Sequence, residues 1–210
     1  NTVVFLLLGG AGLIGKNLCL HLATKGNQVI VFDRPDANYS GIDNISEVRI
    51  VKGLFDETST FDDIFRNNTI DIVIHLISAI VPGDDLTSVI TEVDNNLIST
   101  MKFMECMNRN GVKKMLYFSS GGTVYGNNGN EINCEDHTLV PINSYGWMKV
   151  VVEKYIQYYS YQNNFKYIVL RPSNPYGRFQ NIYGKQGLVA VAIGKIMKSE
   201  PVEVWGDGSV

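Results

Sequence analysis

The sequence predicts an α/β fold, a doubly wound parallel sheet with helices on both faces. Short apolar runs typical of buried parallel strands alternate along the chain with amphipathic stretches of helical periodicity. The first run, residues 3–8, leads through a glycine-rich turn into helical periodicity over residues 13–25. Because parallel strands need crossover connections, this alternation indicates right-handed strand–helix–strand units.

The same alternation predicts the remaining elements. Strands are expected at residues 29–33, 48–51, 70–76, 113–119 and 167–170. Helices are expected at residues 61–67, 86–110 and 144–161. After Arg171, proline and glycine residues interrupt the pattern, and we expect only a helix at residues 188–198 and a strand at residues 202–205.

This organisation predicts one large domain and part of a second. We expect the α/β domain to occupy residues 1–177 and a second lobe to begin at residues 178–210. The chain starts without methionine and stops in a glycine-rich turn. We therefore expect a piece of a longer protein, with the rest of the second lobe absent.

Composition restricts the classes of function. The 210 residues are 45% hydrophobic and 19% charged, which is typical of a soluble globular protein. A net charge of -3, without a local cluster of Lys and Arg, predicts no nucleic-acid partner. The N-terminal apolar run is too short to span a membrane and lacks the features of a signal peptide. Three scattered cysteines indicate a reducing compartment, so we expect a cytoplasmic protein without membrane contact.

Cys134 and His137 could supply half of a metal site. A structural metal usually takes four protein ligands, and the sequence offers no matching second pair. The sequence therefore predicts no metal site.

Gly10, Gly12 and Gly15 fit the pattern G-x-G-x-x-G, placed between the first strand and the first helix. This is the fingerprint of Rossmann folds that bind dinucleotides. The glycines allow a tight turn, a close approach of the backbone to a pyrophosphate, and close packing of helix on strand. Asp33 ends the second strand about 20 residues further on, where an acidic residue binds a ribose hydroxyl.

Tyr145 and Lys149 lie at i and i+4, on one face of a predicted helix. A fixed cation next to a tyrosine favours the phenolate, which can take a proton from a sugar hydroxyl. The spacing alone also fits an exposed tyrosine beside a surface lysine. Its position favours the first interpretation, because the helix follows a strand whose carboxyl end lies at the same sheet edge as the glycine turn.

The chain resembles the extended short-chain dehydrogenases/reductases, and within them the nucleotide-sugar 4-epimerases. The resemblance covers essentially all 210 residues. It rests on the following segments: Gly9, Gly12 and Gly15 of Gly-x-x-Gly-x-x-Gly, Asp33, residues 75–79, residues 96–100, Ser119-Ser120 with Val124-Tyr125-Gly126, Tyr145 with Lys149, residues 170–177, and residues 205–209.

The resemblance implies a role for each site residue. Tyr145 would be the catalytic base, and Lys149 would lower its pKa and hold the nicotinamide ribose. Asp33 would favour NAD over NADP, because a 2′-phosphate would meet a like charge, and Asn174 would contact the substrate. The full set of implied cofactor-binding residues is Gly9, Gly12, Leu13, Ile14, Gly15, Asp33, Leu76, Ser119, Tyr145 and Lys149.

One position departs from the family pattern. The family commonly has a catalytic Ser or Thr where this chain has Gly121. A glycine offers no hydroxyl, so we expect Thr123, two residues further along the turn, to contact the substrate and assist proton transfer. Ser119 and Ser120 are the competing hydroxyls, and a bound water above Gly121 that relays the proton is a further alternative.

The resemblance implies NAD-dependent epimerisation of a nucleotide sugar at C4, through a transient keto-sugar. It also implies a homodimer, joined through the helices expected at residues 86–110 and 144–161. A 4,6-dehydratase is an alternative, although that reaction needs an Asp-Glu pair where Gly122 and Thr123 stand. A reductase of the same family and a non-catalytic NAD-binding regulator are further alternatives; intact Tyr145 and Lys149 count against the regulator.

Overall fold

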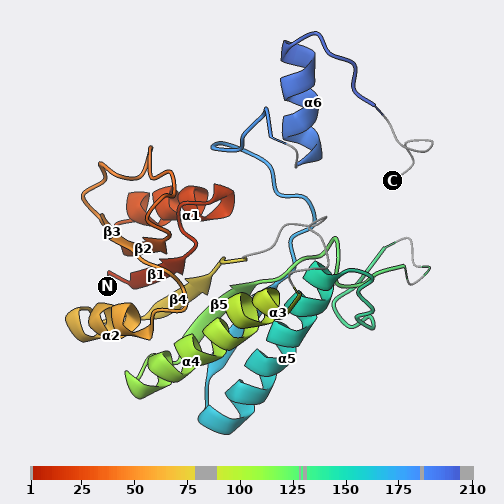
Figure 1. The fold of residues 1–210 in the computed structure, drawn as a ribbon. Helices are drawn as coiled ribbons and strands as arrows, with labels where there is room; N and C mark the ends of the chain where they lie inside the picture. The colour runs from red at the N-terminus through yellow and green to blue at the C-terminus, as the bar shows by residue number, and fades with distance from the viewer. Residues whose placement is uncertain (1, 79–88, 128, 130–131, 185–186, 204–210) are drawn as a thin grey trace. The chain divides into compact units, whose positions relative to one another are not determined.

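A computed structural model describes residues 2–78, 89–127, 129, 132–184 and 187–203 of the chain. Its described part contains a six-stranded sheet in the order β3-β2-β1-β4-β5-β6, and every neighbouring pair is parallel (Figure 1). The strands are β1 (Val4–Leu8), β2 (Gln28–Asp33), β3 (Val48–Lys52), β4 (Ile72–His75), β5 (Lys114–Phe118) and β6 (Lys166–Leu170). The predicted doubly wound Rossmann sheet is confirmed. Its order reverses between β1 and β4, the point at which such sheets bind ligands.

Helices cover both faces of this sheet (Figure 1). The helices of the first part of the chain are α1 (Leu13–Thr24), α2 (Thr58–Asn67), α3 (Val89–Glu92), a π-helical segment η2 (Val93–Ile98), α4 (Ser99–Arg109) and α5 (Ser144–Asn163). A further helix, α6 (Leu188–Met197), follows β6 in the sequence. The helix expected at residues 86–110 is thus α3, η2 and α4 in succession, and its first three residues lie outside the described part. Residues 202 and 203 are not in a strand, contrary to the prediction, and residues 204 and 205 lie outside the described part.

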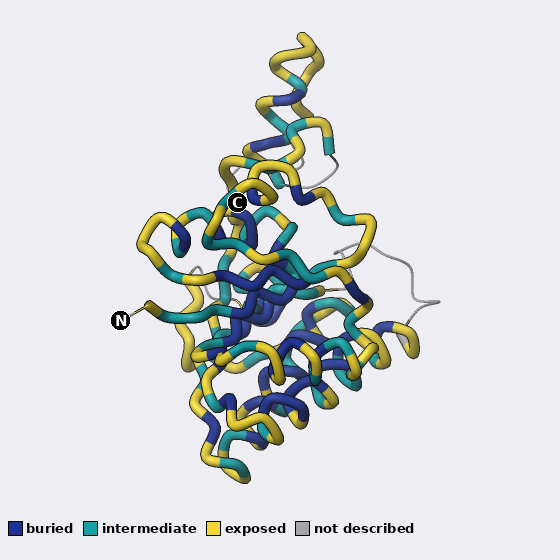
Figure 2. The backbone as a smooth tube through the Cα atoms, turned by 90° about the vertical axis from the view of Figure 1, so that its left-hand side faces the viewer, coloured by how far each residue is buried: buried dark blue, intermediate teal, exposed yellow. Residues whose placement is uncertain are grey.

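The core has two halves because successive strand side chains point to opposite faces of the sheet. Leu6 and Leu8 pack on one side with Phe61 of α2, Phe103 of α4 and residues of α5. Leu7 packs on the other side with α1. Figure 2 shows the strands as the buried centre of this part of the chain. The continuous apolar runs in the sequence reflect this burial on both faces.

The chain divides into two compact units, Asn1–Ser173 and Asn174–Val210. The first contains the sheet and its covering helices, and the second contains α6. The domain boundary predicted after residue 177 falls within the second unit. Among the described residues, we find no helix long and apolar enough to cross a membrane.

Candidate functional site

The glycine turn after β1 is shaped by close contacts. Gly9 has a φ of 78°, a left-handed conformation that favours glycine. A Cβ atom on Gly15 would lie 2.5 Å from Cα of Gly10, so no larger residue fits there without moving the turn. At Gly12 the nearest atom to a Cβ would be the Gly9 carbonyl oxygen at 3.4 Å, an ordinary contact. Gly15 therefore serves packing, whereas Gly12 leaves space at the surface of the turn.

The start of α1, directly after this turn, is the candidate phosphate site. Gly12 is the N-cap of α1, and no side chain caps this end of the helix. Helix N-termini of this kind bind phosphate groups through N–H donors and the helix dipole. Leu76 follows β4 directly, and its N–H donates to the carbonyl oxygen of Leu8 at 2.9 Å. Leu76 thus lies beside the glycine turn, where the order of the strands reverses.

Asp33 closes the same turn from β2. Its Oδ2 accepts a hydrogen bond from the N–H of Ala11 at 2.9 Å, and its Oδ1 accepts one from the N–H of Arg34 at 2.8 Å. These two bonds hold the carboxylate beside the glycines. The predicted ribose-binding acid is therefore positioned at the edge of the predicted phosphate site.

Tyr145 lies in the first turn of α5, whose start is well defined. The side chain of Asn143 caps this helix by accepting from the N–H of Gly146 at 2.7 Å. A Cβ atom on Gly146 would lie 2.6 Å from the carbonyl oxygen of Thr123. The glycine after Tyr145 therefore lets α5 start against the turn that follows β5.

The phenol of Tyr145 forms hydrogen bonds with the side chains of Ser78 and Ser120. These serines follow β4 and β5, two neighbouring strands of the sheet. Burial raises the pKa of Tyr145 above its usual value, and the two serine hydrogen bonds oppose that rise. Burial is the largest cause of the shift, and the predicted lowering of the Tyr145 pKa by Lys149 stays a prediction.

Lys149 lies one helical turn further on and is buried. Its Nζ donates to the carbonyl oxygen of Phe118 at 2.9 Å and lies 5.7 Å from the centre of the Tyr145 ring. Burial lowers the pKa of Lys149 to about 8, and the nearby carboxylate of Glu153 partly opposes this shift. The lysine is thus a fixed ammonium group tied to the end of β5, not a surface side chain.

An ion pair between the buried carboxylate of Glu153 and the partly buried guanidinium of Arg171 supports α5 from the end of β6. The guanidinium of Arg171 binds both carboxylate oxygens of Glu153, at 2.7 and 3.1 Å. The same guanidinium donates to the hydroxyl of Tyr125 at 2.9 Å and to the carbonyl oxygen of Glu135 at 3.1 Å. Arg171 therefore connects the helix that carries Tyr145 and Lys149 to the loop after β5.

Close packing of the backbone explains why position 121 is a glycine in this chain. Its N–H donates to the carbonyl oxygen of Pro172 at 2.8 Å, and a Cβ atom would lie 2.6 Å from the carbonyl oxygen of Arg171. The backbone after β6 therefore occupies the space that a Ser or Thr side chain would need. The Thr123 hydroxyl is buried and has no hydrogen-bond partner among the described residues, as is also true of the Ser119 hydroxyl.

His75 ends β4 and is enclosed by aromatic rings. Its ring makes edge contacts with Phe55 and Tyr117, and its Nε2 lies 3.0 Å from the hydroxyl of Thr100. Burial, with a smaller contribution from the charge of Lys149, lowers its pKa to about 3. His75 is thus a neutral, packed histidine below the site.

A cavity of about 450 Å³ opens beside the carboxyl ends of β5 and β6. Its lining residues include Gly121, Tyr125, Glu135, Arg171 and Ser173. The cavity borders the turn that carries Gly121 and Thr123, so the polar site at this sheet edge adjoins a hollow large enough for a small polar ligand.

The sequence matches the model of the NAD dependent epimerase/dehydratase family over residues 5–210. The chain belongs to this family. A dTDP-4-dehydro-6-deoxyglucose reductase of Escherichia coli is 34% identical, a match covering 96% of this chain and 65% of that protein. A putative UDP-glucose 4-epimerase of Methanocaldococcus jannaschii is 30% identical, covering 98% of this chain and 67% of that protein. The chain spans about half to two thirds of the length of the curated relatives it matches.

Solved structures of epimerases have the same fold. The UDP-glucose 4-epimerase of Thermotoga maritima, determined with UDP-glucose, superposes with a TM-score of 0.89 at 28% identity. That match covers 98% of this chain and 67% of the other. The UDP-glucose 4-epimerase of Thermus thermophilus, determined with NAD, has a TM-score of 0.86 at 24% identity, with 95% and 64% covered. The fold predicted from the resemblance is therefore confirmed.

The cofactor of this epimerase/dehydratase family is NAD. The chain fits that cofactor at three points: the uncapped N-terminus of α1, the carboxylate of Asp33, and the Ser119 hydroxyl that lacks a partner among the described residues. The predicted NAD dependence is confirmed, and the individual contacts remain predictions.

The sequence did not reveal two features of the site in this epimerase/dehydratase family member. The pairing of Ser78 and Ser120 with Tyr145 joins segments 25 to 67 residues apart along the chain. The ion pair of Glu153 with Arg171 joins a helix to a strand end. For this ion pair, the sequence offered only the Tyr-x-x-x-Lys-x-x-x-Glu spacing, which places Glu153 on the same helix face as Lys149.

Proposed function

We propose that the protein catalyses NAD-dependent epimerisation of a nucleotide sugar at C4, through a transient keto-sugar. The observation that carries the proposal is the placement of Tyr145 and Lys149. Both lie on α5 beside the end of β5, at the sheet edge where the glycine turn and Asp33 also lie. A proton acceptor and a dinucleotide site on one edge of a sheet fit oxidation of an alcohol next to a bound cofactor.

In the proposed mechanism, Tyr145 takes the proton of the sugar 4-hydroxyl. NAD, when bound, supplies the acceptor and later the donor of the C4 hydride. Lys149 contributes a positive charge that stabilises the phenolate form of Tyr145 during proton transfer, and holds the nicotinamide ribose. Tyr145 returns the proton after the keto-sugar turns and presents its other face.

Two hydroxyl groups compete to relay this proton in place of the family's Ser or Thr. The hydroxyl of Thr123 is buried and has no hydrogen-bond partner among the described residues, so it makes no competing bond within that part of the chain. Ser120 already forms a hydrogen bond with the Tyr145 phenol. We propose Thr123 as the substrate contact; a fully active Thr123→Val variant, with slow turnover in Ser120→Ala, would transfer the role to Ser120.

Asn174 is proposed to contact the sugar or its diphosphate. It belongs to the second unit, which begins with this residue. The relatives point to nucleotide sugars as the substrate class, because the Thermotoga maritima enzyme was determined with UDP-glucose.

A nucleotide-sugar reductase is the second candidate, because the Escherichia coli relative at 34% identity is named as one. A 4,6-dehydratase is disfavoured, because the turn carries Gly122 and Thr123, which have no carboxylate for its acid and base. Mass spectrometry of products formed from UDP-, GDP- and dTDP-sugars by the full-length protein distinguishes the reactions. Epimerisation leaves mass and added NADH unchanged, whereas reduction of a keto-sugar consumes NADH and adds two hydrogens to the product.

We also propose a cytoplasmic homodimer built on α4 and α5. Tyr158 and Tyr161 of α5 expose 59% and 87% of their surface, which is unusual for neighbouring aromatic residues on one helix and fits a subunit contact. The three cysteines carry no disulfide, which fits a reducing compartment. Sedimentation of wild type and Tyr161→Glu tests the dimer.

A further inference from the structure

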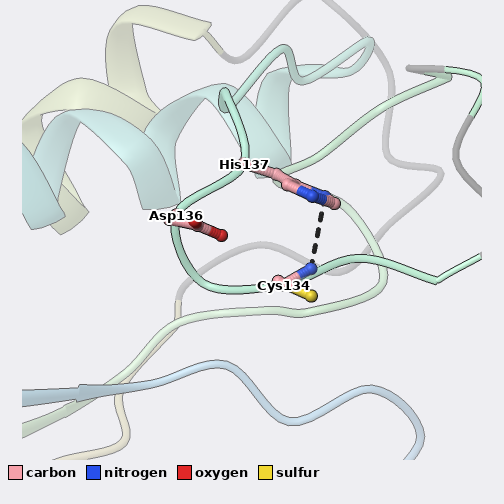
Figure 3. A group of neighbouring side chains, drawn as sticks. All are labelled: Cys134, Asp136 and His137. Atoms are coloured by element: carbon pink, nitrogen blue, oxygen red, sulfur yellow. Dashed lines mark hydrogen bonds between the residues drawn. The ribbon is translucent and has the colours of Figure 1, made fainter.

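Three potential metal ligands meet on the loop between β5 and α5. A thiol, a carboxylate and an imidazole from Cys134, Asp136 and His137 each place one ligand atom within 4.8 Å of the others (Figure 3). The sequence suggested only Cys134 and His137, which is half of a site. The folded loop adds the third ligand, Asp136.

The backbone of this loop brings the three side chains together. The N–H of His137 donates to the carbonyl oxygen of Cys134 at 3.1 Å, which closes a turn over residues 134–137. The N–H of Cys134 in turn donates to Nδ1 of His137 at 3.2 Å, the bond drawn dashed in Figure 3. The imidazole is therefore held over the turn that carries the other two ligands.

The turn is also fixed to the body of the first unit. Arg171, at the end of β6, donates to the carbonyl oxygen of Glu135, the residue between Cys134 and Asp136. Arg171 is itself held by both carboxylate oxygens of Glu153. A site supported by rigid elements loses less entropy when a ligand binds than one on a freely moving loop.

We propose that Cys134, Asp136 and His137 bind one divalent cation of the zinc class. Thiolate and imidazole ligands select borderline metals such as Zn²⁺ and Co²⁺, and disfavour Mg²⁺ and Ca²⁺, which prefer oxygen. Ligand atoms around a tetrahedral Zn²⁺ lie about 3.5 Å apart, given bonds of about 2.0 to 2.3 Å. The three ligand atoms lie within 4.8 Å of one another, so metal binding requires them to move closer together, and water would complete the fourth position.

Asn133 has a defined part in this site. Its Oδ1 lies 3.4 Å from Nδ1 of His137. Ligating histidines usually donate their second ring N–H to an oxygen, which fixes the tautomer and the ring orientation. When the metal is bound, Nε2 of His137 supplies the lone pair to the metal, and Nδ1 carries the proton. Nδ1–H then donates to Oδ1 of Asn133, and the present hydrogen bond from the N–H of Cys134 to Nδ1 is lost.

The test is titration of the metal-free chain with ZnCl₂ by calorimetry and with CoCl₂ by absorption spectroscopy. We expect one ion per chain and, with Co²⁺, a near-ultraviolet band from thiolate-to-cobalt charge transfer. Cys134→Ser removes that band. The other thiols do not substitute for it, because burial raises the pKa of Cys19 to about 11 and is the largest cause of the rise of the Cys106 pKa to about 12.

Matched variants distinguish coordination of Zn²⁺ by the three side chains from electrostatic attraction of the ion to an acidic loop. His137→Gln and Cys134→Ser are each expected to weaken Zn²⁺ binding at least about 10-fold, a loss that even outer-shell partners can cause. Glu135→Gln removes a charge from the same turn without removing a ligand, and His21→Gln removes an exposed histidine of α1. Both controls are expected to retain wild-type affinity. Absence of saturable binding, Co²⁺ binding without the thiolate band, or an equal loss in Glu135→Gln overturns the proposal.

Discussion

The turn after β1 and the turn after β5 lie at the same edge of the sheet but are built differently. The first is made of backbone: Gly9, Gly12 and Gly15 allow close approach, and its donors are N–H groups. The second places side chains: Ser120 meets Tyr145, and Lys149 reaches the carbonyl oxygen of Phe118. A site made of backbone is encoded in a few consecutive residues, whereas a site made of side chains depends on partners elsewhere in the chain.

The largest effect is expected at the turn after β5. Tyr145→Phe should lower turnover of the full-length protein by about 10²- to 10⁴-fold, because a positioned proton acceptor is lost. NAD binding should stay near wild type, since the backbone turn after β1 is untouched. Steady-state kinetics and calorimetry measure the two quantities. Tyr158→Phe, an exposed change on the same helix, is the control; near-normal turnover in Tyr145→Phe would place the base elsewhere.

Glu153→Gln tests whether the ion pair of Glu153 with Arg171 supports the turn after β5. Replacing the buried carboxylate leaves the charge of the partly buried Arg171 without its counter-ion, an expected loss of about 2 kcal/mol in the free energy of unfolding. Denaturant unfolding measures it. Glu105→Gln, an exposed change on α4, is the matched control and should change stability little. Equal stability of the two variants would show that the long-range pair is not what holds α5 in place.

Two alanine variants test separately the packing role of Gly15 and the cofactor-binding role of Gly12 in the turn after β1. Gly15→Ala should cost about 1 to 3 kcal/mol of stability, because its Cβ would lie 2.5 Å from Gly10. Gly12→Ala should leave stability nearly unchanged and weaken NAD binding, because its Cβ would project where a pyrophosphate approaches. Thermal unfolding and NAD titration separate the outcomes. If Gly12→Ala binds NAD normally, the cofactor does not approach the backbone there.

The effect that is smallest at neutral pH, and grows only as the pH falls, concerns His75, on the strand between the two turns. Its folded-state pKa of about 3 lies below the ordinary value of 6.5, so the unfolded chain takes up a proton first as pH falls. The associated stability is present above about pH 6.5 and is lost between about pH 6.5 and 3, by up to about 1.4 kcal/mol per pH unit. His75→Asn should remove that component, whereas His21→Gln should not. If the free energy of unfolding changes equally with pH in wild type and in His75→Asn across this range, the lowered pKa of His75 is contradicted.

The sequence by itself determined the sheet, its doubly wound character and the turn after β1. Alternating apolar runs and helical periodicity are local patterns, and the glycine pattern lies within seven consecutive residues. The observed elements accordingly follow the predicted ranges closely, apart from the π-helical segment η2 and the strand expected at residues 202–205. The Tyr145 and Lys149 pair was also visible, as a spacing on one helix.

Only the tertiary structure decided how that pair is surrounded. Ser78 and Ser120 reach Tyr145 because β4 and β5 are neighbours in the sheet, which no local pattern states. Burial, not the nearby lysine, dominates the pKa of Tyr145, and burial depends on everything packed around the residue. Gly121 is required because the chain after β6 passes within 2.6 Å of where its side chain would be. Such contacts join residues far apart in sequence, so they exist only once the sheet has formed.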